Sequence, residues 1–255
     1  MRTYDIGPTP WRNFYHFGVL DSTNAEAIRL IGKGISSGIV IADRQTAGRG
    51  RGEKSWHSPA GKNLYVSFFA KTGREQAMNA AKIAGLAAYD AVTAFVPAKR
   101  TLLKWPNDLL VDKKKLCGIL IQHLTRSRDL FTVTGIGINL TTPGKKAFEW
   151  VWEPTSLEEA SGGAVETNAA LKELVAALAR WSHATADEIE ARYGKLVRWM
   201  VGAAVTGRTG GEEVAGSVAG FGEGHRTLLL RTADGAEHEI SAGDIDRITF
   251  PGRRT

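Results

Sequence analysis

Cysteine is almost absent from this 255-residue sequence, and long apolar runs are absent altogether. The single cysteine, Cys117, excludes a disulfide within the chain and any metal site built from several cysteines. No apolar run approaches the roughly 18 residues that a membrane-spanning helix requires, and the first residues lack the apolar stretch of a secretory signal. We therefore expect a cytoplasmic protein that does not enter a membrane, with Cys117 a buried small side chain rather than a nucleophile.

The sequence also lacks the glycine-rich fingerprints of two common nucleotide-binding folds. No G-x-x-x-x-G-K-[ST] occurs, which argues against P-loop NTPase chemistry. Gly135-Ile136-Gly137 has no third glycine and lies late in an expected strand, which fits a dinucleotide fingerprint poorly. The net charge is +6 and the pI is near 9.5, a balance that suits anionic ligands or an acidic partner as well as nucleic acid.

Hydrophobic patterning predicts helices packed on a sheet of neighbouring strands. Thr23 followed by Glu26 fits a capping box, so we expect a helix over residues 21–34. Further helices are expected over residues 75–96 and about 168–193, and strands over residues 39–42, 64–69, 102–105, 109–111, 115–122 and 130–139. Residues 112–114 predict a tight hairpin, and such short connections require antiparallel pairing. The fold class is therefore α+β, with a mixed, largely antiparallel sheet and packed helices.

The composition changes after Trp199. Residues 203–249 are short, glycine-rich apolar segments with Asp234-Gly235 as a turn, a pattern typical of a small β-barrel whose closure protects its edges. We therefore expect two domains, residues 1–198 and residues 199–255.

The segment from Gly48 to Trp56 has the composition of a loop that closes over a nucleotide. Its glycines let backbone N–H groups approach a ligand, its arginines suit phosphate, and Trp56 offers a flat apolar surface. A solvated flexible loop would have the same composition, so the segment alone leaves both interpretations open.

Lys104-Trp105-Pro106-Asn107-Asp108 is a second polar cluster, placed where proline interrupts a strand. It is consistent with a polar turn or with a site. Lys115 opens the next apolar strand, where it could equally be the solvated end of a hairpin. Gly118 inside that strand favours a site, because a strand glycine often marks the close approach of a ligand.

Together these segments resemble the catalytic domain of biotin–protein ligases. The resemblance rests on four stretches in the family's order and spacing, which cover residues from about 20 to 140: Asp21–Asn24, Gln45–Trp56, Lys104–Leu120 and Gly135–Asn139. It implies a class II synthetase-like catalytic domain, and residues 216–245 resemble the family's C-terminal SH3-like barrel.

The resemblance also implies two overlapping sets of binding residues. Those expected to hold biotin are Ser22, Thr23, Asn24, Gln45, Arg49, Gly50, Arg51, Lys115 and Gly118. Those expected to bind ATP and the adenylate are Arg49, Arg51, Trp56, Asn107, Lys115 and Asn139.

Three residues are expected to be catalytic: Lys115, Arg51 and Asp108. Asp108 would help hold Mg²⁺ or would orient the acceptor lysine, and the sequence leaves these two roles open. Glu53 stands where many family members have glycine, and an acidic side chain there is expected to point away from the ligand or to pair with Lys54.

The activity that the resemblance implies has two steps. Biotin and ATP, with Mg²⁺, give biotinyl-5'-AMP and pyrophosphate. The biotinyl group then passes to a lysine of a biotin carboxyl carrier domain, in acetyl-CoA carboxylase or a related biotin-dependent carboxylase. The edges of such sheets can pair, which makes a homodimer one allowed oligomeric state.

Three alternatives come from related or different classes. A lipoate-type acyl-protein ligase shares the fold, but the loop from Gly48 to Trp56 favours biotin. A non-catalytic binding module is opposed by Lys115 and the loop arginines. A DNA-binding biotin repressor needs a helix-turn-helix domain, which the about 20 residues before Asp21 cannot build. We therefore expect no DNA binding.

Overall fold

The computed structural model describes residues 4–52, 54–61, 63–142, 153–209, 212–242 and 245–249, and Glu53 lies outside these ranges. The chain divides into two compact units, Met1–Ile189 and Glu190–Thr255. This division falls inside helix α5 (Ala186–Val197), and the domain boundary at residue 198 stays a prediction. No helix within the described ranges is long and apolar enough to cross a membrane.

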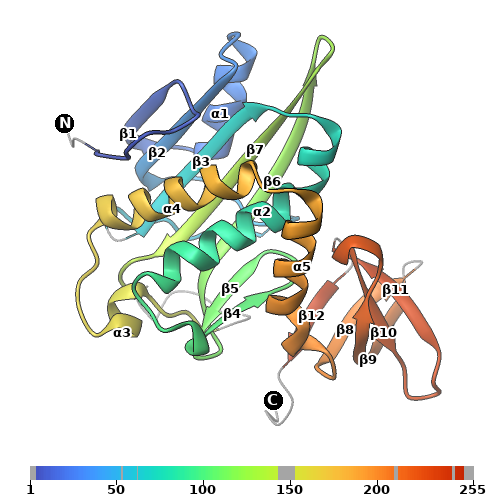
Figure 1. The fold of residues 1–255 in the computed structure, drawn as a ribbon. Helices are drawn as coiled ribbons and strands as arrows, with labels where there is room; N and C mark the ends of the chain where they lie inside the picture. The colour runs from blue at the N-terminus through green and yellow to red at the C-terminus, as the bar shows by residue number, and fades with distance from the viewer. Residues whose placement is uncertain are drawn as a thin grey trace. The chain divides into compact units, whose positions relative to one another are not determined.

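The first unit is built on a seven-stranded mixed sheet with the order β1-β2-β3-β7-β6-β5-β4 (Figure 1). The strands are β1 (Phe14–Leu20), β2 (Ser37–Gln45), β3 (Asn63–Lys71), β4 (Thr101–Lys104), β5 (Asp108–Val111), β6 (Lys114–Arg126) and β7 (Asp129–Asn139). β1 pairs with β2 in parallel, and the other neighbouring strands pair antiparallel. The expected α+β class with a mixed sheet and packed helices is therefore confirmed.

Helices cover both faces of this sheet. Because side chains alternate along a strand, Phe69 of β3 faces α1 (Thr23–Gly32) and packs in a buried cluster with Leu30 and Ile31. Its neighbour Phe68 points to the other face, where it lines a cavity with Ile83 of α2 (Arg74–Thr93) and Leu178 of α4 (Thr167–Ser182). Figure 1 shows α2 and α4 crossing the sheet side by side. The short α3 (Leu157–Ser161) precedes α4.

The hairpin between β5 and β6 forms as expected. Asp112 and Lys113 at its tip have φ values of 48° and 63°, the left-handed pair that a two-residue hairpin turn requires. The turn pairs Leu110 with Lys115, and a register shift between Leu109 and Leu110 then places Asp108 opposite Gly118.

Two local predictions were wrong. The N-cap of α1 is Ser22 rather than Thr23, its side chain makes no capping hydrogen bond, and Glu26 instead pairs with Arg29. The single helix expected over residues 168–193 is two helices, α4 and α5. A capping box starts the second one: Thr185 N–H donates to Glu188 Oε2 at 2.8 Å, and Glu188 N–H donates to Thr185 Oγ1 at 3.3 Å. Because apolar residues continue at helical spacing from α4 into α5, the sequence pattern alone did not reveal the break between them.

The second unit holds a five-stranded antiparallel sheet with the order β11-β10-β9-β8-β12. Its strands are β8 (Ala204–Thr209), β9 (Glu212–Phe221), β10 (Thr227–Arg231), β11 (Glu237–Ser241) and β12 (Ile245–Thr249). Gly235 takes a φ of 88° in the expected turn. The buried side chains of this sheet include Val218, Leu228, Leu230 and Ile240. Closure of this sheet into an SH3-like barrel stays a prediction.

The cluster around Phe69 yields a stability prediction. Phe69→Ala should lower the free energy of unfolding by about 4 kcal/mol, because the truncation leaves a cavity in a packed core. Denaturant titration measures the change, and Val19→Ala, at a position 58% exposed, is the matched control with an effect under about 0.5 kcal/mol. A loss below about 1 kcal/mol for Phe69→Ala would contradict the packing described.

Candidate functional site

On the face of the sheet that α1 covers, three glycines on β6 and β7 form a patch without side chains. Gly118 of β6 pairs with Gly137 of β7. A Cβ on Gly118 would lie 2.7 Å from the Trp56 indole, and one on Gly137 would lie 2.6 Å from it. A Cβ on Gly135 would lie 2.2 Å from Asn24 Oδ1. We call Gly118, Gly135 and Gly137 the glycine floor. Because these residues have no side chain, Trp56 and Asn24 can lie directly against the backbone of the two strands.

The loop that carries Trp56 folds back on itself. Arg49 and Ser55 form an isolated antiparallel bridge, and Trp56 N–H donates to Gly48 O at 2.9 Å. This turn lays the indole over the glycine floor, where its Nε1 is buried and has no hydrogen-bond partner among the described residues. The side chain of Arg49 is exposed, so this structure does not bring it into the charged cluster described next.

A buried carboxylate between two ammonium groups lies beside the glycine floor. Asp108 Oδ1 is 2.6 Å from Lys115 Nζ, and its Oδ2 is 3.2 Å from Lys104 Nζ. The side chains of Asp108 and Lys104 are each 8% exposed and that of Lys115 is 28% exposed. Burial alone would raise the pKa of Asp108, but Lys115 and Lys104 outweigh burial and lower it to about 2. Burial lowers the pKa of Lys104, and attraction to Asp108 opposes that effect.

Arg51 brings a third cation to this cluster. Its Nη1 donates to Asn107 Oδ1 at 3.1 Å, and Asn107 Nδ2 donates to Ile119 O at 2.7 Å. Burial lowers the pKa of Arg51 while Asp108 raises it, and a guanidinium keeps its charge in proteins. Lys115 Nζ lies 5.5 Å from the centroid of the Trp56 ring. Two lysines and one arginine against one aspartate give a formal excess of positive charge, which suits a site where two anionic groups must meet.

The surroundings of Asp108 bear on the two roles left open for it. Both carboxylate oxygens face ammonium groups, and a divalent cation would have to displace a lysine to reach either. Among the described residues no group of three His, Cys, Asp or Glu side chains could hold a metal. This geometry does not fit a magnesium ligand. With a pKa of about 2 the carboxylate is also a weak base at neutral pH, and in this structure it holds two ammonium groups.

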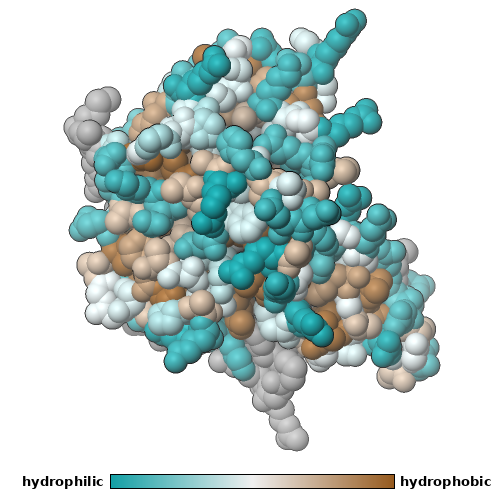
Figure 2. Space-filling view, in the orientation of Figure 1, coloured by the Kyte–Doolittle hydropathy of each residue, from teal (hydrophilic) through white to brown (hydrophobic). Residues whose placement is uncertain are grey.

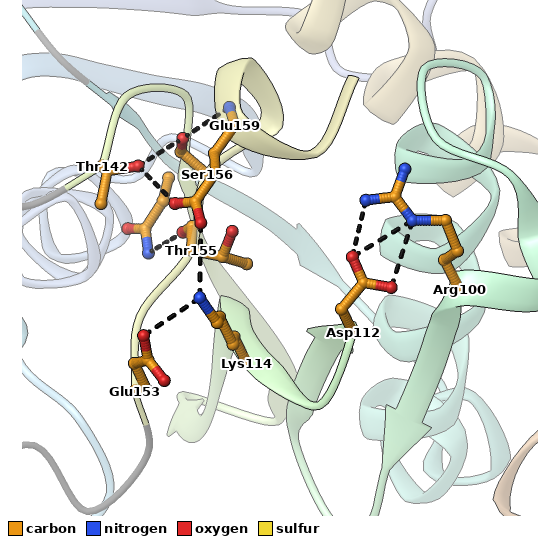
Figure 3. Close-up of polar contacts among 9 residues, drawn as sticks. Arg100, Asp112, Lys114, Thr142, Glu153, Thr155, Ser156 and Glu159 are labelled. Carbon is orange, nitrogen blue, oxygen red and sulfur yellow. Dashed lines mark hydrogen bonds and ion pairs between the residues drawn. The ribbon is translucent and has the colours of Figure 1, made fainter. Parts of the chain in front are cut away.

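The backbone of Lys115 is held by the segment that follows residue 152. Lys115 N–H donates to Glu153 O at 2.8 Å, and Thr155 N–H donates to Lys115 O at 2.9 Å. Figure 3 shows the neighbouring Lys114 ammonium between Glu153, at 3.0 Å, and Glu159, at 3.4 Å. These contacts fix the strand from which Lys115 reaches Asp108.

Asn139 is part of the same framework. It is 5% exposed, and its Nδ2 donates to Thr155 O at 3.0 Å and to Lys115 O at 3.4 Å. Both amide protons therefore go to protein carbonyl groups, and only the amide oxygen remains for an adenine ring.

A polar cluster lies at the other side of the glycine floor, where α1 begins. Gln45 Oε1 accepts from Thr23 N–H at 2.8 Å, and Gln45 Nε2 donates to Ser58 Oγ at 2.8 Å. These two bonds fix the amide orientation and leave one Gln45 N–H for a ligand. Ser22 is buried, and its hydroxyl makes no capping hydrogen bond. Such a set of fixed donors and acceptors suits a ligand head group that is polar on several sides.

The structure therefore gathers the predicted residues into two groups on either side of the glycine floor. The charged group holds Arg51, Asn107, Asp108 and Lys115, and the polar group holds Ser22, Thr23, Asn24 and Gln45. Sequence reasoning missed the following residues: Lys104, Ser58, Ser67 and Gln122. Two of them could have been found from the sequence. Lys104 belongs to the polar cluster Lys104–Asp108, and Ser67 is a polar residue within an apolar strand.

Comparisons with known proteins agree on one family. Residues 18–139 match the model of the biotin/lipoate A/B protein ligase family. The chain is 38% identical to the biotin–[acetyl-CoA-carboxylase] ligase of Paracoccus denitrificans over 63% of this chain and 69% of that protein. It is 30% identical to the enzyme of the same name from Mycobacterium tuberculosis over 92% of this chain and 89% of that protein.

A solved structure is similar over nearly the whole chain. The biotin protein ligase from Aquifex aeolicus, in complex with biotin and ATP, superposes with a TM-score of 0.69 at 25% identity, covering 94% of this chain and all of that one. The similarity thus extends beyond the residues that the family model matches.

The buried charge cluster yields a prediction about stability. Asp108→Asn should lower the free energy of unfolding by about 3 kcal/mol, because it leaves two ammonium groups without their counterion. Chemical denaturation at neutral pH measures this, with Asp112→Asn on the exposed hairpin tip as control.

The effect should also depend on pH. The folded-state pKa of about 2 lies below the ordinary 3.8, so the stabilisation by Asp108 is complete above about pH 4 and is lost as the pH falls towards 2. The difference between the two proteins should therefore shrink on acidification. An equal difference at all pH values would contradict the ion pairs described.

Proposed function

The chain belongs to the biotin–protein ligases of the biotin/lipoate A/B protein ligase family, and we propose on this basis how its residues carry the reaction. The enzyme joins biotin and ATP to give biotinyl-5'-AMP and pyrophosphate, and then transfers the biotinyl group to a lysine of a biotin carboxyl carrier domain. The observation that carries this mechanism is the position of Arg51, Lys104 and Lys115 around Asp108, beside a glycine floor with a polar cluster at its other side.

In the first step a biotin carboxylate oxygen attacks the α-phosphorus of ATP. A bond forms between these two atoms, the bond from the α-phosphorus to the bridging oxygen breaks, and pyrophosphate leaves. Two anions must approach, so the main task of the protein is to neutralise charge at fixed positions. Lys115 and Arg51 supply that charge, while Lys104 keeps Asp108 in place as Lys115 turns to the substrates.

The polar cluster suits the ureido ring of biotin. This ring presents N–H donors and a carbonyl acceptor, which match the free Gln45 N–H and the Ser22 hydroxyl. The dithiolane ring of lipoate offers no such groups and would leave buried polar atoms unpaired, a penalty that enzymes use for strong discrimination. The cluster therefore favours biotin over lipoate.

In the second step the neutral acceptor lysine amine attacks the biotinyl carbonyl carbon: a C–N bond forms, the bond from that carbon to the phosphate oxygen breaks, AMP leaves, and the amine proton passes to the leaving phosphate or to water. Asp108 would orient ammonium groups during this step rather than take a proton, because of its low pKa. Until the acceptor arrives the anhydride must be kept from water. Trp56 would cover it, with its unpaired indole N–H available to the adenylate.

Mg²⁺ is expected with ATP, where it neutralises phosphate charge. Among the described residues no group of three or more His, Cys, Asp or Glu side chains could hold it, and the ATP phosphates and water would supply most of its ligands. The adenine contact proposed for Asn139 is limited to its amide oxygen.

Several features of the whole protein remain part of this proposal. We propose that residues 199–255 form a domain whose sheet closes as an SH3-like barrel, and that the enzyme acts in the cytoplasm. Residues 4–13 contain no helix, so this described segment does not form a helix-turn-helix, and we propose that the enzyme does not bind DNA. β1 is an edge strand, and pairing of such an edge between two copies is the route by which a homodimer would form.

Release of pyrophosphate tests the function directly. The purified chain should release pyrophosphate from ATP when biotin is added and at least about a hundredfold less when lipoate replaces it. Equal release with both acids would overturn the assignment to biotin.

Replacing Lys115 should impair the first step most. Lys115→Met is expected to cost about 2–4 kcal/mol of transition-state stabilisation, a fall of roughly 30- to 1,000-fold in the rate of adenylate formation. Single-turnover formation of biotinyl-5'-AMP measures it, with the exposed Lys99→Met as control. A Lys115→Met rate within about tenfold of wild type would rule out the proposed role.

Removing Arg51 should release the intermediate too early. Arg51 ties the loop to Asn107, and loss of a charge-assisted hydrogen bond weakens such a closure by about tenfold or more. Arg51→Gly is therefore expected to label bystander proteins about tenfold more than wild type when given biotin and ATP. Unchanged bystander labelling, with adenylate still formed, would show that Arg51 does not retain the intermediate.

A further inference from the structure

The side chain of Asn24, at the start of α1, has almost no hydrogen-bonding capacity left for a ligand. Its Nδ2 donates to Gln122 Oε1 at 2.9 Å and to Leu120 O at 3.3 Å, which uses both amide protons. Its Oδ1 accepts from Ser67 Oγ at 2.6 Å. Asn24 is 4% exposed. It therefore ties α1 to the sheet and presents at most one lone pair to a substrate.

Ser67 connects this carboxamide to the rest of the polar cluster. Its hydroxyl is fully buried and lies 2.7 Å from Thr23 Oγ1 as well as 2.6 Å from Asn24 Oδ1. A hydroxyl has one proton and an amide oxygen can only accept, so Ser67 is the donor that Asn24 depends on. Thr23 in turn donates to Gln45 Oε1 through its backbone N–H, at 2.8 Å, and through its hydroxyl, at 3.2 Å. One hydroxyl from β3 thus fixes two consecutive residues of the expected biotin site.

Gln122 fixes the same carboxamide from the opposite side. It comes from β6, two residues beyond Leu120, and only its Oε1 is needed to accept from Asn24. Gly135 of β7, which lies between β3 and β6 in the sheet, leaves the space into which Asn24 Oδ1 fits. The position of Asn24 is therefore set by side chains and backbone from three strands.

We propose that Ser67 and Gln122 are positioning residues for biotin, which act by locking Asn24 and Thr23 rather than by contact with the substrate. This inference rests on the proposed function, because it assigns the polar cluster to the biotin head group. Without the lock, Asn24 and Thr23 can rotate and compete for the hydrogen bonds meant for the ligand. Biotin affinity should fall, while ATP binding and the chemical step, which depend on the cluster around Asp108, should be preserved.

Steady-state kinetics of biotin-dependent pyrophosphate release test this split. Ser67→Ala and Gln122→Leu should each raise KM for biotin about tenfold, the scale of one lost buried hydrogen bond. KM for ATP and kcat should change less than about twofold. Gln122→Glu keeps an acceptor oxygen for Asn24 Nδ2 and should restore a KM for biotin near that of wild type. Thr132→Val removes a hydroxyl contact, 2.8 Å to Thr72, on the other face of the sheet and serves as the control.

A double-mutant cycle shows whether Gln122 works through Asn24. Asn24→Ala should raise KM for biotin by itself, and adding Gln122→Leu should then change it less than about twofold. Full additivity, or a KM for biotin within twofold of wild type for both Ser67→Ala and Gln122→Leu, would overturn the inference. Gln122 is only half-buried, so its variants keep the test valid if Ser67→Ala fails to fold. A wild-type protein without biotin-dependent pyrophosphate release would instead refute the proposed function.

Discussion

A carboxylate buried between two ammonium groups is the interaction on which the site depends. Asp108 Oδ1 lies 2.6 Å from Lys115 Nζ and its Oδ2 lies 3.2 Å from Lys104 Nζ, so its negative charge is the counterion of both ammonium groups. In turn the lysines keep Asp108 ionised at any pH that a cell experiences. The resulting excess of positive charge exists before any substrate arrives, so it needs no rearrangement when two anions meet there.

The sheet makes this possible by presenting different surfaces to its two faces. One face carries the glycine floor, over which Trp56 and Asn24 lie. The other face, which α2 and α4 cross in Figure 1, carries aromatic and aliphatic side chains such as Phe68. Figure 2 shows that hydrophilic side chains dominate much of the surface in the same view, with apolar residues scattered among them, as expected for a folded protein of this size.

The sequence predicted the tight hairpin that joins the strands of Asp108 and Lys115, because a polar tip between two apolar runs is a local signal, and the family resemblance assigned Asp108, Lys115 and Gly118 to one site. Sequence reasoning could not place Ser67 or Gln122 beside Asn24, because that meeting depends on the order β3-β7-β6, which brings together segments far apart in the chain. It joined α4 and α5 because apolar spacing outweighed the capping box at Thr185. β1 was not predicted, since glycine and histidine interrupt its apolar pattern.

The pairing of β6 with β7 has a consequence for how mutations sort. Gly118 lies opposite Gly137, and the next pair along, Ile119 and Ile136, points into the buried core. Neighbouring residues of these strands therefore serve different purposes: the glycines shape the site, and the isoleucines stabilise the fold. We expect changes at the glycines to remove activity from a protein that still accumulates, and changes at the isoleucines to lower the amount of folded protein. A mutational scan scored for both abundance and growth would separate the two classes with a period of two residues.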